Sequence, residues 1–395
     1  GNAVGQVQDF GSVNVQQVRF NSTLSPAPAG SAVGSALKTL NDLETSAGPI
    51  KVVVRGGNLT INDGTDGDGI GVVATGASDI LLWASSNLDI NAQVRSGGGH
   101  VTLQAGNDID IDAAVSTVAS GTIYVTGRDL RVNATVTTSA GDQLFTATRD
   151  LSVIATVTSS GGSIALLAGR DLQVNSTIST STGNLRLSAT QDLNVNAVLN
   201  STEDSIGLLA GRNITQTANV TAGGDVLINA VGNFTQNSGT STMAGLVPQV
   251  PIRDTLQVTT GGTQRLALLS AGHISLDAGG DILDNNGIDV VNLRANTLGM
   301  VAGGIIGGPG TPPPTPLNAD INANALDTDV GTVAARSAQG IYLQEVASGG
   351  SLIVGNAVGQ VQDFGSVNVQ QVRFNSTLSP APAGSAVGSA LKTLN

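Results

Sequence analysis

Apolar and polar residues alternate in short runs along most of this 395-residue chain. Leu172, Val174 and Ile178, for example, share one set of alternate positions, and Gln173 and Asn175 occupy the other. A period of two places successive side chains on opposite faces of an extended backbone. The pattern therefore predicts β-strands that have one aliphatic and one polar face.

These runs recur at a fixed spacing. The text AGRDLQVNSTI at 168–178 is followed by ATQDLNVNAVL at 189–199, and AGNDIDIDAAV precedes both at 105–115. Repeats of this length are typical of solenoids, in which each coil packs only on its neighbours. The apolar residue that opens the run returns every 21 residues, at Leu88, Ile109, Leu130, Leu151, Leu172, Leu193 and Ile214.

Each 21-residue coil carries about three alternating segments, and glycine pairs such as Gly161-Gly162 and Gly223-Gly224 mark a corner between two of them. Parallel crossover connections are strongly biased to the right-handed form. We therefore predict an all-β fold, a right-handed parallel β-helix with about 21 residues per coil and short loop insertions. An α/β solenoid is the alternative, but the coils carry no helical periodicity.

The insertions interrupt the period at named places. Residues 62–69 (NDGTDGDG) lie within a 29-residue step from Leu59 to Leu88, and proline-rich loops are expected at 246–254 and 309–316. The apolar spacing in 31–45 also predicts one short amphipathic helix after a proline-containing linker. Without these insertions the unit would contain roughly 14–16 coils and extend on the order of 70 Å.

The first 41 residues and residues 355–395 have identical sequences. We interpret 1–354 as one full β-solenoid repeat unit and 355–395 as the start of the next, identical unit in a tandem array. Neighbouring units are expected to stack end to end within one chain, with Ile341, Leu343, Leu352 and Val354 continuing the strand pattern across the boundary. We expect the 395-residue chain to be part of a longer polypeptide.

Composition narrows the class of protein further. Aromatic residues make up 2% of the chain and cysteine is absent, which fits a thin aliphatic core and an extracellular protein without cross-links. The net charge is −12, and one unit without the repeated 41 residues has 15 basic and 28 acidic residues, so 15 − 28 = −13. Such a polyanion would repel nucleic acid and attract divalent cations. The most apolar tract, 298–308, is too short to span a membrane.

The inserted loop is the strongest chemical signal. Asp63, Asp66 and Asp68 stand among glycines, and carboxylate oxygens on a flexible backbone are suitable ligands for Ca²⁺. The spacing differs from an EF-hand and no bidentate Glu follows. We consider two interpretations, a calcium site and a solvated Asp/Gly turn, and expect no other cofactor.

Other polar residues recur in the coil register. Asp108, Asp110 and Asp112 share the outward face of one segment, and Arg128, Arg149, Arg170 stand beside recurring Asp residues, which predicts mutual neutralisation along the rod. Recurring Asn residues predict an amide ladder, at Asn91, Asn133, Asn175, Asn196 and Asn237.

We find no catalytic arrangement in the sequence and expect that the chain is not an enzyme. His100 and His273 are far apart in coil number, and each stands just before a strand, as an ordinary polar turn residue does. The alternative is a carbohydrate-binding or polysaccharide-cleaving β-helix, which would require carboxylates, basic groups and aromatic rings in one groove.

The A-G-R-D-L-x-V-N-A coils, with G-G-x-I-x-L segments between them, resemble the repeats of filamentous haemagglutinin and related giant bacterial surface exoproteins. The resemblance covers about residues 50–300. It implies a secreted, rod-like β-helix that is used in adhesion or in building a cell-surface layer. Its motifs are specific for the fold and only weakly for the function. We expect either an extracellular filament with a binding domain at its tip or a sheath or fibre held by lateral self-association through the proline-rich loops and the Asp/Arg ladders.

Overall fold

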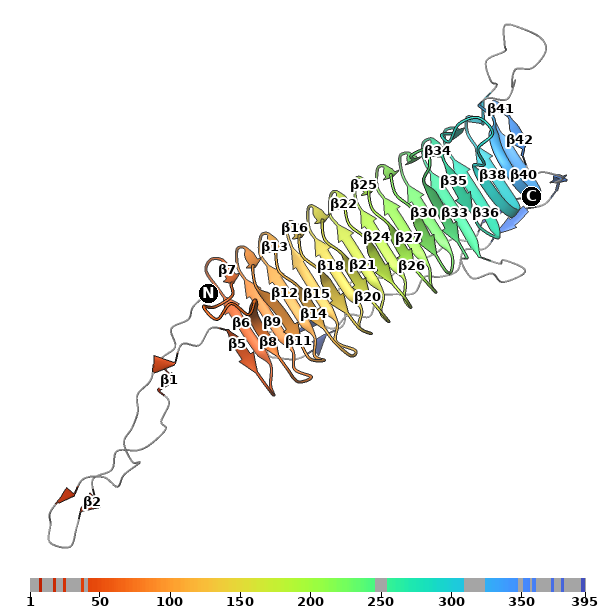
Figure 1. Cartoon of the computed structure of the whole chain (residues 1–395). Helices are drawn as coiled ribbons and strands as arrows, with labels where there is room; N and C mark the ends of the chain where they lie inside the picture. Colours follow the sequence, from red (N-terminus) through yellow and green to blue (C-terminus); the bar gives the residue numbers. More distant parts are fainter. Residues whose placement is uncertain are drawn as a thin grey trace.

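The computed structural model describes residues 42–245, 254–308, 324–346 and 351–355, together with the backbone of eight short strands outside these ranges. The described residues form a β-solenoid of about twelve turns, and they contain strands, turns and loops but no helix. Figure 1 shows the coils stacked into a rod, with successive strands side by side. The predicted all-β fold and the 21-residue coil are confirmed.

One sheet contains one strand from every coil, joined in parallel. Leu88 pairs with Ile109, and Ile109 with Leu130, so the 21-residue period of the sequence is the step from one coil to the next. The strands of this sheet, which we call the first ladder, are β7 (Leu59–Ile61), β10 (Leu88–Ile90), β13 (Ile109–Ile111), β16 (Leu130–Val132), β19 (Leu151–Val153), β22 (Leu172–Val174), β25 (Leu193–Val195), β28 (Ile214–Gln216), β31 (Phe234–Gln236), β34 (Gln264–Leu266), β37 (Ile282–Asp284), β39 (Ile305–Ile306) and β41 (Gly340–Ile341).

The second ladder follows the first along each coil. Its strands are β5 (Leu43–Thr45), β8 (Ile70–Ala74), β11 (Gln93–Ser96), β14 (Val115–Thr117), β17 (Val136–Thr138), β20 (Val157–Ser159), β23 (Ile178–Thr180), β26 (Leu199–Ser201), β29 (Val220–Ala222), β32 (Ser241–Ala244) and β35 (Leu268–Ser270).

The third ladder completes the coil with longer strands. They are β6 (Ile50–Val54), β9 (Ile80–Ala84), β12 (Val101–Ala105), β15 (Ile123–Gly127), β18 (Gln143–Ala147), β21 (Ile164–Ala168), β24 (Leu185–Ala189), β27 (Ile206–Ala210), β30 (Val226–Ala230), β33 (Thr255–Thr260) and β36 (His273–Ala278).

The second and third ladders merge near the end of the stack. β38 (Leu293–Ala302) pairs with both β35 and β36, and β40 (Leu326–Ser337) continues along its whole length. β42 (Leu343–Glu345) and β43 (Ile353–Val354) then pair with the two halves of β40. In these last turns β38 and β40 are therefore each a single long strand that runs through the corner between the second and third ladders.

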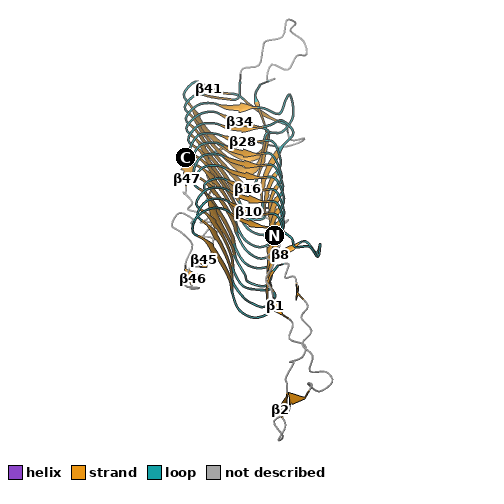
Figure 2. Cartoon of the chain, turned by 90° about the vertical axis from the view of Figure 1, so that its left-hand side faces the viewer, coloured by secondary structure: helices purple, strands orange, loops and turns teal. Residues whose placement is uncertain are grey.

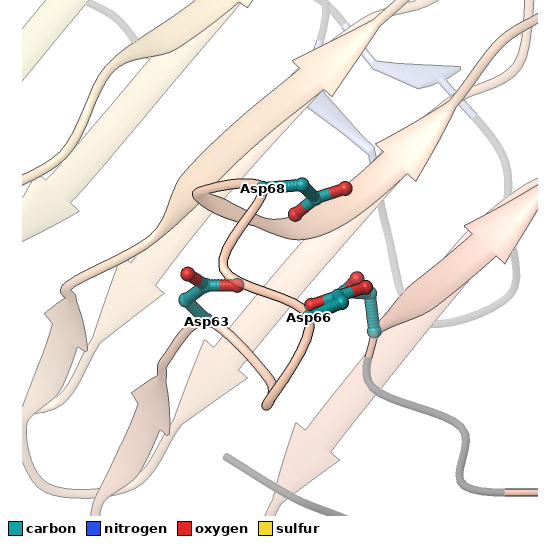
Figure 3. A group of neighbouring side chains, drawn as sticks. Asp63, Asp66 and Asp68 are labelled. Carbon is teal, nitrogen blue, oxygen red and sulfur yellow. The ribbon is translucent and has the colours of Figure 1, made fainter.

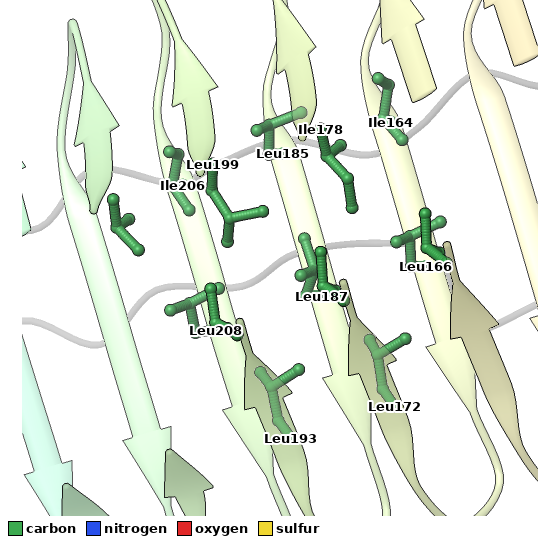
Figure 4. Packing of buried hydrophobic residues seen from close by; sticks show 14 of the residues in the cluster. Ile164, Leu166, Leu172, Ile178, Leu185, Leu187, Leu193, Leu199, Ile206 and Leu208 are labelled. Atoms are coloured by element: carbon green, nitrogen blue, oxygen red, sulfur yellow. The ribbon is translucent and has the colours of Figure 1, made fainter. Parts of the chain in front are cut away.

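The core is a column of aliphatic side chains inside the coils. Leu166, Leu187 and Leu208 stack on one another along the axis and are inaccessible to solvent (Figure 4). Burying such side chains stabilises the stack by about 1.5–3 kcal/mol each. Because each coil provides the same few aliphatic positions, the core is narrow and needs almost no aromatic residue.

Glycine corners allow the coils to approach closely. A Cβ on Gly141 would overlap the carbonyl oxygen of Gly121 in the preceding coil, and a Cβ on Gly162 would overlap that of Gly141. A hydroxyl closes the same corner, since Thr180 Oγ1 donates to Gly162 O at 2.8 Å. The predicted role of the glycine pairs at this corner is confirmed.

The prediction of a helix at 31–45 is wrong for residues 42–45, the part of this range that the structure describes in full. Leu43–Thr45 is the strand β5, and Leu43 pairs in parallel with Val72. A helix of this length is marginal in water, whereas the strand gains pairing with β8 at the first coil.

Most of 246–254 and 309–316, the two proline-rich loops, and most of the continuation past residue 355 lie outside the described residues. The described part has about twelve turns, fewer than the 14–16 coils estimated for the unit. Most of residues 1–41, which that estimate included, lie outside the described residues.

Candidate metal centre and acidic surface

The Asp-rich loop is inserted between β7 and β8, at the corner where the first ladder leads into the second. Gly67 and Gly69 have positive φ angles of 73° and 77°, a backbone conformation that side chains with a Cβ rarely adopt. The loop therefore turns sharply within a few residues, and the 29-residue step from Leu59 to Leu88 keeps the strand register intact.

The loop gathers its three carboxylates, and Figure 3 shows Asp63, Asp66 and Asp68 around its turn. A fourth residue, Asp42, joins them, and one ligand oxygen from each of the four lies within 4.8 Å of the others. Two oxygens on opposite sides of a bound Ca²⁺ are separated by about 4.6–5.2 Å, twice the usual Ca–O distance. The spacing of the four carboxylates thus suits one calcium ion.

Sequence reasoning missed Asp42 because it lies 21 residues before Asp63 and within the predicted helix. Asp42 comes directly before β5, and β5 pairs with β8, the strand that follows the loop. One sequence feature could have located Asp42. Leu43 and Thr45 alternate with a polar residue as a strand does, and pairing of this strand with Val72 and Ala74 places Asp42 beside the loop.

The four carboxylates repel one another. Burial and the charges of Asp66, Asp68, Asp63 and Glu44 raise the pKa of Asp42 above its ordinary value. Asp42 Oδ1 and Asp63 Oδ1 are shielded from solvent and accept no hydrogen bond, whereas Asp68 Oδ1 accepts one from the Ile70 N–H at 2.8 Å. A cation here would relieve the repulsion and supply the missing partner.

The acidic stripe on the first ladder is neutralised by arginines from the next coil. Arg128 binds Asp108 through two hydrogen bonds, Nε to Oδ1 at 3.0 Å and Nη2 to Oδ2 at 2.9 Å. Arg128 Nε also lies 3.6 Å from Asp129 Oδ2 in its own coil. Equivalent two-bond pairs recur along the rod, at Arg149–Asp129, Arg170–Asp150 and Arg212–Asp192.

These pairs change the ionisation of the carboxyls. Burial opposes ionisation of Asp129, but hydrogen bonds from Arg149 and from the Asp150 N–H outweigh it and lower the pKa of Asp129. The hydrogen bond from Arg212 lowers the pKa of Asp192 in the same way. The predicted mutual neutralisation is confirmed.

The amide ladder forms in part. Asn196 donates to Asn175 Oδ1 at 2.9 Å and Asn91 donates to Asn62 Oδ1 at 2.8 Å, each between successive coils. Asn133 instead donates to Asp112, at 2.7 Å. These bonds run along the axis and stabilise the stacking of coils.

The groups that a carbohydrate site would need lie on different faces. Burial raises the pKa of Asp110, although Arg131 lies 3.7 Å away and acts in the opposite direction. Asp110 is on the first ladder, whereas Trp83 and Tyr124 are on the outward side of the third.

The two histidines stand where strands of the third ladder begin. His100 directly precedes β12, and His273 is the first residue of β36. His100 Nδ1 lies 2.9 Å from Thr122 Oγ1, and His273 Nδ1 lies 2.6 Å from Thr297 Oγ1. In both cases the partner belongs to the following coil, so the contact joins one coil to the next.

No protein-family model, curated protein or solved structure matches the chain. In the part of the chain that the structure describes, no helix has the length and apolar character needed to cross a membrane.

Proposed function

We propose that the chain is a structural segment of a long, tandemly repeated extracellular fibre, of the kind found in filamentous haemagglutinin-like surface proteins. The observation that carries this proposal is the combination of open coil ends with a repeated sequence. Residues 1–41 return unchanged at 355–395, and in a tandem array of this unit each end coil would have a further unit to stack on.

The two end coils present apolar strand edges. At one end Leu43 is 42% exposed, and at the other Ile353 and Val354 are 60% and 84% exposed. Exposed strand edges invite pairing with another chain or coil. Stacking of the next unit would bury these residues and continue the ladders, and the number of copies would then determine the length of the fibre.

The fibre would act mechanically, as a stiff rod that holds a binding domain away from a cell or builds a sheath or surface layer. Lateral contacts between rods are the second part of this proposal. The negative charge and the regular Asp/Arg pairs support an external, hydrated surface rather than one that binds nucleic acid.

Immunogold electron microscopy of intact cells of the source organism tests the proposal. Antibodies against residues 42–308 should label fibres outside the cell without permeabilisation. Label that appears only after permeabilisation would overturn the extracellular assignment.

We also propose that Asp42, Asp63, Asp66 and Asp68 bind calcium in the first coil. The ion would tie the inserted loop to the residue that begins β5, and so fasten the coil on which the preceding unit would stack. The closeness of the four carboxylates and the two unpartnered oxygens support this. The other interpretation, a solvated turn, requires no ion.

Calorimetric titration with Ca²⁺ and with Mg²⁺ distinguishes the two interpretations. The wild-type chain should bind one Ca²⁺ and bind it more tightly than Mg²⁺. The double variant Asp66→Asn/Asp68→Asn should lose this Ca²⁺ binding. Glu203→Gln is the control, since Glu203 is an exposed acid in a turn elsewhere. Equal binding by wild type and the double variant would favour the solvated turn.

A polysaccharide-binding or cleaving β-helix is the alternative function, and the raised pKa of Asp110 is the observation that favours it. Pectin or alginate should then be shortened by the wild-type chain and not by Asp110→Asn. Unchanged polymer in both reactions supports the structural role.

A further inference from the structure

The outward side of the second ladder carries no charged residue over six successive coils, from β14 to β29. In each coil the first, third and fifth residues of a five-residue run lie on the outward side, and the two residues between them are buried. Serine, threonine and asparagine fill most of the outward positions. We call this surface the neutral face, and its runs are 114–118, 135–139, 156–160, 177–181, 198–202 and 219–223.

Strand pairing aligns the outward residues of the neutral face into rows along the rod. Thr137 pairs with Thr158, and Thr158 with Ser179, so equivalent side chains follow one another at about 4.8 Å. The neighbouring row is in register too, because the Val136 N–H donates to the Thr156 carbonyl at 3.1 Å. Figure 2 shows the strands of successive coils in such rows. The neutral face is therefore a regular, repeating surface.

The side chains of the neutral face are available to a partner. Val118 and Val198 are apolar, yet they are 46% and 41% exposed. The hydroxyls of Thr137 and Thr158 form no hydrogen bond with the residues that the structure describes. A hydroxyl can donate one hydrogen bond and accept others, so this surface offers both polar and apolar contacts.

The other sides of the same coils are less suited to contact with a second rod. The first ladder and the corner before it present Arg131 and Arg212, whose side chains are 65% and 56% exposed. Arg212 already forms two hydrogen bonds with Asp192 of its own chain. On the third ladder the outward Leu144 is 0% exposed. Since the chain has a net charge of −12, two copies would approach most easily through a side without charges.

The period of the neutral face indicates which partner fits it. A second copy of this chain has rows with the same ~4.8 Å spacing, so the hydroxyl and methyl groups of two aligned rods stay in register along the whole face. Protein interfaces are depleted of charged residues at the centre and polar at the rim. Glu203 and Asp204 are exposed directly beside the run 198–202, at the border of the face.

The size of the neutral face sets the strength of this contact. Six coils at ~4.8 Å and five residues at ~3.3 Å give a face of about 29 Å by about 17 Å, so a pair of faces would bury about 960 Å². Stable interfaces bury about 1,200–2,000 Å². One pair of units should therefore associate weakly, and rods of many units should gain affinity from repeated contacts.

We propose that the neutral face is the surface through which two copies of this chain pack side by side with their axes aligned. This inference deepens the lateral part of the proposed function and rests on it. The contact is made by the hydroxyl, amide and aliphatic side chains of the second ladder, and the Asp/Arg pairs stay within each rod. In an array every unit would add one such contact, so long rods would bundle more tightly than single units.

Analytical ultracentrifugation of the full chain at increasing concentration, with small-angle X-ray scattering of the same samples, tests the proposal. We expect a monomer–dimer equilibrium in which the dimer has a larger cross-section and a nearly unchanged length. Added salt should strengthen the dimer, because it screens the repulsion between two anionic rods, whereas a contact made by Asp/Arg pairs would weaken. A chain that stays monomeric up to its solubility limit, or a dimer of doubled length, contradicts the proposal.

Two matched double variants locate the contact. Thr137→Glu/Thr158→Glu places two carboxylates on adjacent coils of the neutral face, and Gln173→Glu/Asn194→Glu places the same charge on adjacent coils of the first ladder. The first variant should weaken the dimer at least tenfold, and the control should stay close to the wild type. All four positions face outward, so the melting temperatures of the two variants should be similar. Equal weakening by both variants would overturn the assignment of the neutral face.

A basic variant separates the neutral face from general charge repulsion. Thr137→Lys/Thr158→Lys reduces the net charge to −12 + 2 = −10, which lowers the overall repulsion between copies. It should nevertheless weaken the dimer, since it places unpaired ammonium groups in the centre of the contact. Stronger association of this variant would mean that net charge alone governs the contact, and would overturn the proposal.

These results are distinct from a failure of the fibre itself. A chain that stays monomeric but labels fibres outside the cell would remove only the side-by-side contact. Label that appears only inside the cell would remove the extracellular fibre and leave the dimer of the purified chain unchanged.

Discussion

At the scale of single residues, the close approach of successive coils depends on positions where no side chain fits. Gly141 faces the carbonyl oxygen of Gly121 one coil below, whereas Gly56 has open space where a Cβ would stand. The same amino acid therefore has a packing role at one turn and none at the other.

We predict that Gly141→Ala destabilises the chain by about 1–3 kcal/mol, since the added methyl group forces apart two stacked coils. Gly56→Ala should change the unfolding free energy by less than about 0.5 kcal/mol. Urea denaturation of the two variants checks this. Equal stability of both would mean that the glycine corners do not fix the coil spacing.

The Asp/Arg pairs make stability sensitive to acid. The Arg212 hydrogen bond lowers the pKa of Asp192 in the folded chain below its ordinary value of 3.8. This contribution to stability is therefore complete above that value and is lost as the pH falls through the lowered pKa.

Between pH 5 and pH 2 the melting temperature of the wild-type chain should fall more steeply than that of Asp192→Asn. The Arg212 side chain is 56% exposed and the Asp192 side chain 25% exposed, so solvent screens the pair and the difference will be small. Glu203→Gln should keep the wild-type slope. A variant Asp192→Asn with the wild-type slope would show that the pair does not couple ionisation to folding.

At the scale of the element, each strand is short and gains its stability from the strands above and below. Leu187 on β24 is fully buried between Leu166 and Leu208, and Val198 in a nearby turn is 41% exposed. In a quasi-one-dimensional stack the effect of one core residue should be concentrated in its own coil and the adjacent ones.

Leu187→Ala should therefore cost about 2–5 kcal/mol, whereas Val198→Ala should be close to neutral. Hydrogen exchange resolved by peptide should place the lost protection in β21, β24 and β27. Uniform loss along the whole rod would contradict nearest-neighbour stacking.

The elements were predictable where a local pattern fixed them. Alternation and the 21-residue step identify the strands from Leu88 to Ile214, because each coil repeats the same environment. β5 was mistaken for a helix, since its pairing with β8 spans an inserted loop, and Asp42 was missed for the same reason. The burial of Leu144 was not predictable either, because alternation says which face a residue occupies but not whether another segment covers that face.

At the scale of the whole molecule, two features act together, a rod with open ends and a repeated sequence that follows it. In the proposed fibre the stacked coils would make the rod stiff, and the exposed residues Leu43 and Val354 would be covered when another unit stacks there. The described stack of about twelve turns corresponds to a length of about 58 Å at ~4.8 Å per turn.

The most direct measurement of this account is the length of chains that contain one, two and three copies of the 354-residue unit, imaged by cryo-electron microscopy. We predict straight rods with a 4.8 Å axial repeat that lengthen by the same increment, at least about 58 Å, with every added copy. Copies that separate into compact particles joined at variable angles would contradict end-to-end stacking and the fibre that depends on it.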